Sequence, residues 1–212
     1  MYNMTMNEEI AIIKNWLGLG SINVFGLPYS GKDTVGIRLA EAINGRYLSS
    51  GLILREAKEN QAVSDSLKAG LWVPTDQFYD LVLPFFHRED LKDLPLILGG
   101  IGRWSGEEPA VMDAASSSGH EIKAVILLNM SEADVHLRWE QGKILQDRGE
   151  RSDDQNEKSL DTRINEFRTK TMPVIQTYRN LGLLIPIRAD MSKDEVFTEV
   201  LQKLAAFAAS NS

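Results

Sequence analysis

The chain contains no cysteine among its 212 residues. Disulfide bonds, thiolate zinc sites and cysteine nucleophiles are therefore excluded. No uninterrupted apolar run reaches membrane-spanning length, so no membrane partner is expected. The first twenty residues carry Glu8, Glu9 and Lys14 among apolar positions, unlike the basic start and unbroken apolar stretch of a signal peptide. Together these absences favour a cytoplasmic protein.

Basic residues are outnumbered, since Lys and Arg total 23 against 30 Asp and Glu, for a net charge of −7. Proteins that bind nucleic acid over a broad surface usually present a basic face, so no nucleic-acid polymer is expected as a partner. His87, His120 and His136 are scattered along the sequence, and we interpret all three as surface residues. The length, with 43% hydrophobic residues, suits one domain with a core, and we expect a monomer.

Helical and strand-like apolar patterns alternate along the chain. Helical spacing predicts helices over 7–17, 34–42, 52–68 with a break near Ser64, 75–83, 132–141, 157–181 and 193–208. Short apolar runs predict buried strands over 21–25, 94–98, 122–129 and 183–187. The charged stretch 143–154 has few apolar anchors and is predicted to be a mobile loop. This alternation implies a parallel sheet covered by helices on both faces.

A glycine-rich motif follows the first predicted strand and precedes a predicted helix. It reads Gly26-Leu27-Pro28-Tyr29-Ser30-Gly31-Lys32-Asp33-Thr34. Glycines let the backbone turn its N–H groups inward to form an anion nest at a helix N-terminus, and Lys32 adds a point charge for β- and γ-phosphates. The strand-loop-helix context favours a phosphate-binding loop over an incidental glycine turn. The sequence therefore predicts that the chain binds the phosphates of a nucleoside triphosphate.

One residue of this loop departs from a simple phosphate cradle. Asp33 follows Lys32 directly, and the hydroxyl comes one position later, at Thr34. A carboxylate at this place repels a triphosphate unless a metal ion or another cation lies between them.

From about 22 to 204, the chain resembles the adenylate kinase family of nucleoside monophosphate kinases. The family's loop reads Gly-x-Pro-Gly-x-Gly-Lys-Gly-Thr, and the matching residues here are Gly26, Pro28, Gly31, Lys32 and Thr34. Tyr29 and Asp33 replace two glycines. The resemblance implies an α/β P-loop NTPase three-layer fold within one domain. Its core would comprise 1–49, 82–137 and 151–212, with a monophosphate-binding insertion at 50–81 and a short lid at 138–150.

Two further motifs resemble the family's acceptor-binding segments. Leu48-Ser49-Ser50-Gly51-Leu52-Ile53-Leu54-Arg55 resembles the segment that holds the acceptor phosphate, with Arg55 at the position of the phosphate-binding arginine. Ser50 stands where the family usually has threonine, and Leu52 where it has aspartate. Ala69-Gly70-Leu71-Trp72-Val73-Pro74 resembles the turn that contacts the acceptor base. Trp72 suits stacking on a base and equally suits a place in the core beneath the insertion.

The segment Leu96-Ile97-Leu98-Gly99-Gly100-Ile101-Gly102-Arg103 resembles the family motif Leu-Asp-Gly-Phe-Pro-Arg. Gly100 and Arg103 match, whereas Gly99 replaces the aspartate and Gly102 the proline. Glu107 stands four positions after the arginine, where the family often has a glutamine that reads adenine. Because a carboxylate only accepts hydrogen bonds, Glu107 suits the N1–H and amino group of guanine, or is simply solvated.

Arginines at the spacing of the family's lid come next. Arg138 stands at the first lid arginine, and Lys143 and Arg148 are both candidates for the second. Arg151-Ser152-Asp153-Asp154 and the later Arg163 resemble the family's Arg-x-Asp-Asp and the arginine of the following helix. The short interval between Arg138 and Arg151 resembles the short-lid members, which have no room for a zinc finger, so no zinc is expected.

The resemblance implies an ATP-dependent kinase that transfers the γ-phosphoryl group to a nucleoside monophosphate, AMP by family frequency. It implies ATP contacts from Tyr29, Ser30, Gly31, Lys32, Asp33, Thr34 and Arg138. It implies monophosphate contacts from Ser50, Gly51, Arg55, Leu71, Trp72, Val73, Gly100, Arg103, Glu107, Arg151 and Arg163. The catalytic set would be Lys32, Arg103, Arg138, Arg151 and Arg163, since positioning and charge neutralisation dominate phosphoryl transfer.

The cofactor implied is Mg²⁺, bound with ATP. In the family the aspartate that is absent at Gly99 holds waters on this ion. We hypothesise that Asp33, together with Thr34, serves the ion instead, because one carboxylate disappears and another appears nearby.

Two other functions stay open. One is a catalytically weak nucleotide-binding protein of the same fold, which the departures at Leu52, Gly99, Gly102 and Glu107 favour. The other is a P-loop kinase for a different small acceptor, which the arginines at 55 and 103 disfavour.

Overall fold

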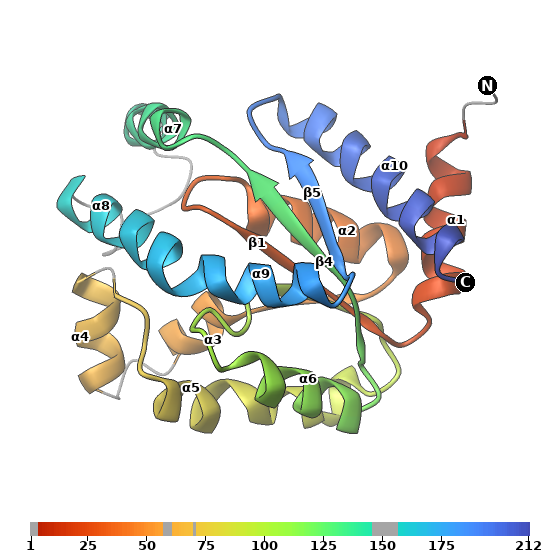
Figure 1. Ribbon diagram of the computed structural model, residues 1–212, viewed down its shortest axis with the longest axis horizontal. Helices are drawn as coiled ribbons and strands as arrows, with labels where there is room; N and C mark the ends of the chain where they lie inside the picture. Colours follow the sequence, from red (N-terminus) through yellow and green to blue (C-terminus); the bar gives the residue numbers. More distant parts are fainter. Residues whose placement is uncertain (1–3, 57–60, 70, 146–156) are drawn as a thin grey trace.

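The computed structural model describes residues 4–56, 61–69, 71–145 and 157–212. A five-stranded parallel sheet forms its centre, with the strand order β2-β3-β1-β4-β5 (Figure 1). In that order the strands are β2 (Arg46–Ser49), β3 (Leu96–Gly99), β1 (Ser21–Gly26), β4 (Ile122–Asn129) and β5 (Leu184–Arg188). The expected α/β P-loop architecture of a parallel sheet with helices on both faces is confirmed.

The central strand β1 is buried along its whole length. It pairs with β3 on one side, where Val24 lies opposite Gly99, and with β4 on the other, where Val24 lies opposite Ile126. A strand covered on both faces is mostly apolar and does not alternate between apolar and polar residues. Since all strands are parallel, their carboxyl ends meet at one edge, which is where ligands bind in open α/β sheets.

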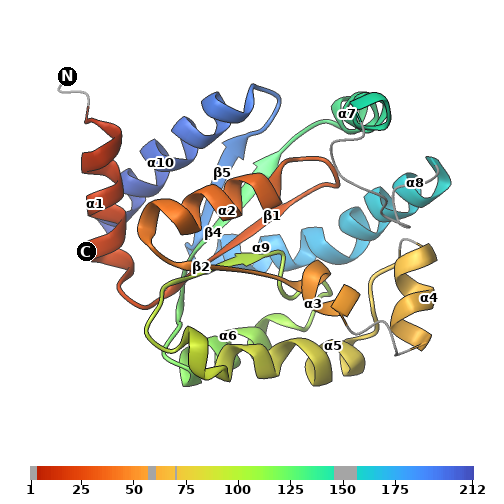
Figure 2. The same cartoon turned by 180° about the vertical axis from the view of Figure 1, so that it is seen from behind.

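One face of the sheet is covered by α1 (Met6–Leu17), α2 (Lys32–Ile43) and α10 (Lys193–Ser210), which lie together in Figure 2. Capping boxes start two of these helices, with Thr5 and Glu8 at α1 and with Ser192 and Glu195 at α10. Such caps satisfy backbone N–H groups that have no partner inside the helix. The shared core of this face includes the fully buried Leu39.

The opposite face is covered by α3 (Ser50–Glu56), α5 (Thr75–Val82), α6 (Glu108–Ser117) and α9 (Met172–Asn180), with 3₁₀ turns at Leu83–His87 and Glu89–Leu91 (Figure 1). Phe25, Phe86 and Tyr178 are the largest fully buried side chains there. Helices α4 (Gln61–Ala69), α7 (Glu132–Leu145) and α8 (Glu157–Glu166) lie toward the carboxyl edge of the sheet, and α4 contacts α8. They therefore surround the edge at which the phosphate loop lies.

Several element predictions needed correction. Strand β2 and helix α6 were missed, because β2 has only four residues with Arg46 exposed and α6 is rich in small Ala and Ser residues. No break occurs near Ser64, since α4 is continuous from Gln61 to Ala69. Residues 143–145 belong to α7, and 146–154 lie outside the described residues.

The long helix predicted over 157–181 is divided into α8, a π-helical segment at Phe167–Thr171, and α9. Pro173 lies in the first turn of α9. A proline is tolerated at this position because its missing N–H would have no partner inside the helix.

The surface interpretation of the histidines is wrong for His120, which is fully buried. Its Nδ1 lies 2.9 Å from the carbonyl oxygen of Leu19, and its own carbonyl accepts a hydrogen bond from Ser21. His87 is exposed, and His136 is half-buried with Nε2 3.3 Å from Asp161. Among the described residues, none of the helices combines the length and the apolar character needed to cross a bilayer.

We predict that Tyr178→Phe stabilises the protein. The hydroxyl of Tyr178 is buried and has no hydrogen-bond partner among the described residues, and burial followed by the charge of Glu108 raises its pKa. Removing an unsatisfied buried hydroxyl should raise the free energy of unfolding by about 1 kcal/mol, measured by urea denaturation. A lower free energy of unfolding would contradict this account of the hydroxyl.

Candidate active site

The phosphate loop connects β1 to α2 at the carboxyl edge of the sheet. Gly31 precedes α2 with φ 87°, in the left-handed region. A side chain is strained at such a φ. The N–H groups of the first turn of α2 have no partner within the helix and form a binding site for an anion. Lys32 is the first residue of α2, and only 15% of its side chain is exposed. Its positive charge therefore lies beside these N–H groups.

Tyr29 has a second function that the sequence did not reveal. It has a left-handed backbone, with φ 63°, although its ring is only 8% exposed. The ring packs against Val135 and Trp139 of α7 and against Leu160 and Ile164 of α8. The tyrosine that replaces a family glycine therefore anchors the phosphate loop to two helices, and this packing offsets a backbone strain of roughly 1–2 kcal/mol.

We predict that Tyr29→Gly lowers stability even though it relieves this strain. Truncating a buried aromatic ring costs about 3–5 kcal/mol, so the net loss should be roughly 2 kcal/mol after subtracting the strain. Guanidinium chloride denaturation measures it. Gly31→Ala is the matched control, because a methyl at Gly31 meets open space and reports only the backbone cost. Unchanged stability of Tyr29→Gly would show that the aromatic cluster does not anchor the loop.

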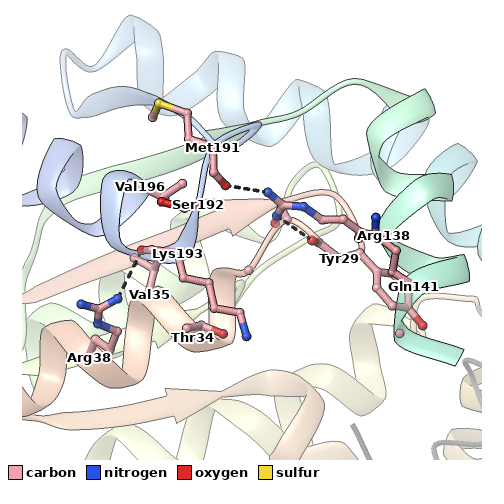
Figure 3. Close-up of a pocket in the computed structure, with 13 residues that line it drawn as sticks. Tyr29, Thr34, Val35, Arg38, Arg138, Gln141, Met191, Ser192, Lys193 and Val196 are labelled. Atoms are coloured by element: carbon pink, nitrogen blue, oxygen red, sulfur yellow. Dashed lines mark hydrogen bonds between the residues drawn. The ribbon is translucent and has the colours of Figure 1, made fainter. Parts of the chain in front are cut away.

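A cavity of about 390 Å³ lies beside the loop (Figure 3). It is formed by the loop, α2, α7 and the start of α10, and its lining includes Tyr29, Ser30, Gly31, Thr34, Val35, Arg38, Arg138, Gln141, Gly142, Met191, Ser192, Lys193 and Val196. Its volume is within the range of small-molecule sites. Five residues expected to contact ATP therefore share one cavity: Tyr29, Ser30, Gly31, Thr34 and Arg138.

Backbone carbonyls fix Arg138 in this cavity. Its guanidinium donates hydrogen bonds to the carbonyl oxygens of Tyr29 at 3.3 Å and Met191 at 3.0 Å (Figure 3), and to that of Ala189 at 2.6 Å. These contacts connect α7, the phosphate loop and the segment after β5. Arg138 thus lies in the larger cavity rather than in the second cavity, which contains Arg163.

The second cavity, of about 10 Å³, lies on the other side of the loop. Three predicted catalytic cations line it from three separate segments: Lys32, Arg103 and Arg163. Arg163 is only 9% exposed. This volume suffices for about one water molecule, so the side chains must separate to admit a phosphate.

The turn that contains Arg103 is fixed by a buried amide on β1. Asn23 donates to the carbonyl of Ile101 at 2.7 Å and accepts from its N–H at 3.2 Å. Gly102 has φ 72°, which a proline cannot adopt, so this turn differs from the family's. Asn23 was not among the predicted site residues, although a polar residue inside a buried strand is a signal for it.

Trp72 is docked against α8 and the π-helical segment that follows it. Its backbone N–H donates to Glu166 at 3.0 Å, and its indole N–H donates to Thr171 at 3.0 Å. The hydroxyl of Thr171 then donates to the carbonyl of Arg103 at 2.9 Å, and the Arg103 guanidinium lies 4.9 Å from the indole ring centre. Trp72 is half-buried in the second cavity, which favours the packing interpretation over a free stacking surface.

Glu107 was expected either to read a base or to be solvated, and solvation is wrong because it is only 3% exposed. One carboxylate oxygen accepts from the N–H groups of Arg103 at 2.9 Å and Trp104 at 3.0 Å, and the other accepts from Thr75 at 2.9 Å. Burial raises the pKa of Glu107. Ser50, also expected on the acceptor, donates to the carbonyl of Gly100 at 2.8 Å.

The remaining predicted residues are placed only in part. Gly51 lies in α3, and Leu71 is exposed whereas Val73 is buried. Arg55 also lies in α3, but its side chain lies outside the described part of the structure, and Arg151 lies outside the described residues altogether. Their roles stay predictions.

The raised pKa of Glu107 gives a pH prediction. Because the folded state binds this proton more readily than the unfolded state, Glu107 contributes more stability at low pH and loses it as pH rises through the folded pKa. Glu107→Gln has no such titration, so its stability relative to the unsubstituted protein should increase as pH rises above 4.5, the ordinary pKa of the group. Urea denaturation at a series of pH values measures it. A pH-independent difference would contradict the shift.

Asp33 is placed by two neighbours. Its Oδ1 lies 3.7 Å from Nζ of Lys32 and accepts a hydrogen bond of 2.7 Å from the hydroxyl of Tyr47. Tyr47 was not among the predicted site residues, because its contact with Asp33 depends on the pairing of β2 with β3.

No protein-family profile matches the chain. Individual relatives do, including an adenylate kinase from Deinococcus deserti that is 30% identical over 185 residues, covering 84% of this chain and 92% of that protein. An adenylate kinase from Thermus thermophilus is 27% identical over 190 residues, covering 87% and 97%. A UMP-CMP kinase from Danio rerio is 29% identical over 194 residues, covering 84% and 92%.

Among solved structures, the chain is similar to a gluconokinase from Sinorhizobium meliloti, with a TM-score of 0.62. The similarity covers 92% of this chain and 96% of that one at 18% sequence identity. At this identity the likeness shows the fold alone, which is the α/β P-loop NTPase fold.

Proposed function

This chain belongs to the adenylate kinase family of P-loop kinases, and from that premise we propose that it transfers the γ-phosphoryl group of ATP to a nucleoside monophosphate. The observation that carries the proposal is the convergence of Lys32, Arg103 and Arg163 on one cavity beside the phosphate loop. The phosphates of the donor, ATP, can be bound by the phosphate loop and one cation. Further arginines suit an acceptor that already carries a phosphate, because guanidinium groups bind phosphate through paired hydrogen bonds.

In this proposal the loop amides and Lys32 hold the β- and γ-phosphates, and the larger cavity with Arg138 holds the donor nucleoside. Arg103 and Arg163, with Arg55 and Arg151, hold the acceptor phosphate and the migrating group. AMP is the first acceptor to test. The insertion 50–81 and the lid 138–150 close over both substrates and exclude water, which would otherwise accept the phosphoryl group.

The residues beside the loop fit Mg²⁺. This ion prefers hard oxygen ligands and is usually held by substrate phosphates with one or two carboxylates. The hydroxyl of Thr34 lines the donor cavity, and the Asp33 side chain is 29% exposed. Within the described residues no cluster of three histidine or acidic side chains could hold a metal alone, so Thr34 and Asp33 would assist an ion held mainly by ATP. The ion would neutralise negative charge on the phosphates.

A catalytically weak nucleotide-binding protein is the second candidate. It is favoured by the absence of a carboxylate at Gly99 and by the bonds of Ser50 and Glu107 to protein groups. A kinase for another small acceptor is the third.

A coupled assay separates the three candidates. We expect turnover of ATP with at least one of AMP, GMP, CMP, UMP and their deoxy forms, and none with gluconate. Failure of every monophosphate with ATP still bound would support the binding protein, and turnover of gluconate alone would support the third candidate.

We predict that Arg103→Lys lowers kcat/KM for the acceptor by about 100-fold, because a lysine keeps the charge but loses the two-pronged geometry. Steady-state kinetics with the acceptor varied measures it. Arg179→Lys is the matched control, since Arg179 is exposed on α9, where its guanidinium donates a hydrogen bond to Gln176. Equal losses in both variants would refute a specific role for Arg103.

A further inference from the structure

Tyr47 of β2 occupies the space beside Gly99. A Cβ atom at Gly99 would lie 2.1 Å from the Tyr47 hydroxyl oxygen, and a Cβ atom at Gly36 of α2 would lie 2.3 Å from Cε2 of the ring. Side-chain carbons do not approach other heavy atoms so closely. The ring therefore requires glycine at both positions. The absence of an aspartate at position 99 is therefore sterically linked to the presence of Tyr47.

Tyr47 also holds the carboxylate of Asp33, the residue that replaces a glycine of the family's phosphate loop. Its hydroxyl donates to Oδ1 of Asp33 at 2.7 Å, and Nζ of Lys32 lies 3.7 Å from that oxygen. Because a carboxylate only accepts hydrogen bonds, the Tyr47 hydroxyl is the donor in this contact. Because the Asp33 side chain is 29% exposed, it can still contact a ligand.

These contacts place Asp33 close to the space that an aspartate side chain at 99 would occupy. The Tyr47 hydroxyl overlaps the space that the Cβ of such an aspartate would need, and Asp33 accepts a hydrogen bond from that hydroxyl. Asp33 also lies in the first turn of α2, where the helix dipole stabilises a carboxylate.

We propose that Tyr47 is a positioning residue, which orients the Asp33 carboxylate toward the Mg²⁺ of Mg·ATP and replaces the arrangement that an aspartate at 99 would provide. The inference rests on the proposed function only for the donor, ATP. Groups that hydrogen-bond a metal-binding carboxylate commonly contribute 10- to 100-fold to metal affinity, so the effect is measurable in binding. A tyrosine that merely fills space would contribute to stability and not to the dependence on Mg²⁺.

The test is the equilibrium affinity for ATP as a function of free Mg²⁺, with no acceptor present. Tyr47→Phe keeps the ring and removes only the hydroxyl. We expect the Mg²⁺ concentration for half-maximal enhancement of ATP binding to rise about 10-fold, with ATP binding in EDTA unchanged. Asp33→Asn should show the same rise, and the double variant should be no worse than Asp33→Asn alone. Tyr178→Phe, the matched control, should leave this concentration unchanged.

A normal Mg²⁺ dependence in Tyr47→Phe, with or without a lower melting temperature, would overturn the proposal. So would additive effects of Tyr47→Phe and Asp33→Asn, because a positioning residue acts through the group that it positions.

A carboxylate exchange gives a second readout. Gly99→Asp alone should lower the melting temperature, because its Cβ collides with Tyr47. Adding Gly99→Asp to Tyr47→Ala supplies a carboxylate where space has been opened, and it should restore Mg²⁺-dependent ATP binding relative to Tyr47→Ala alone. No recovery in a folded double variant would contradict the exchange. Since no acceptor is used, these outcomes are distinct from failure of the kinase assay.

Discussion

The site depends on the backbone of the loop between β1 and α2, which must turn its N–H groups toward one point. Left-handed conformations at Tyr29 and Gly31 make that turn. Glycine provides one without strain, whereas the tyrosine is held by aromatic packing against α7 and α8. The burial of β1 between β3 and β4 fixes where the loop begins. A phosphate cradle thus results from sheet pairing on one side and helix packing on the other.

Charge is distributed unevenly around this loop. The chain carries a net charge of −7, yet three cations line the smaller cavity. Two buried carboxylates nearby serve the protein's own groups, since Glu107 holds the backbone at Arg103 and Glu166 holds the backbone of Trp72. Lys170 also pairs with Glu166 at 2.7 Å. Glu107 and Glu166 therefore organise the backbone around the cationic cavity, and Asp33 lies 3.7 Å from Nζ of Lys32 at its edge.

The sequence predicted the local features and missed those that depend on tertiary contacts. The strand at 122–129 and the strand-loop-helix context of the phosphate loop are confirmed, because apolar runs and glycine spacing are local signals. Tyr47 could not be identified, since its neighbours Gly36 and Gly99 come close only in the folded sheet. His120 was misassigned because one polar residue before a strand carries no sign of burial.

In the proposed kinase, the two cavities beside the loop hold two substrates joined by one path of phosphoryl transfer. The most direct measurement is the affinity for an analogue in which a phosphate chain joins two nucleosides, compared with the affinity for ATP. Because the second contact becomes intramolecular, the analogue should bind about 100-fold more tightly than ATP, and Arg103→Lys should remove most of that gain. Equal affinity for the analogue and for ATP would contradict the claim.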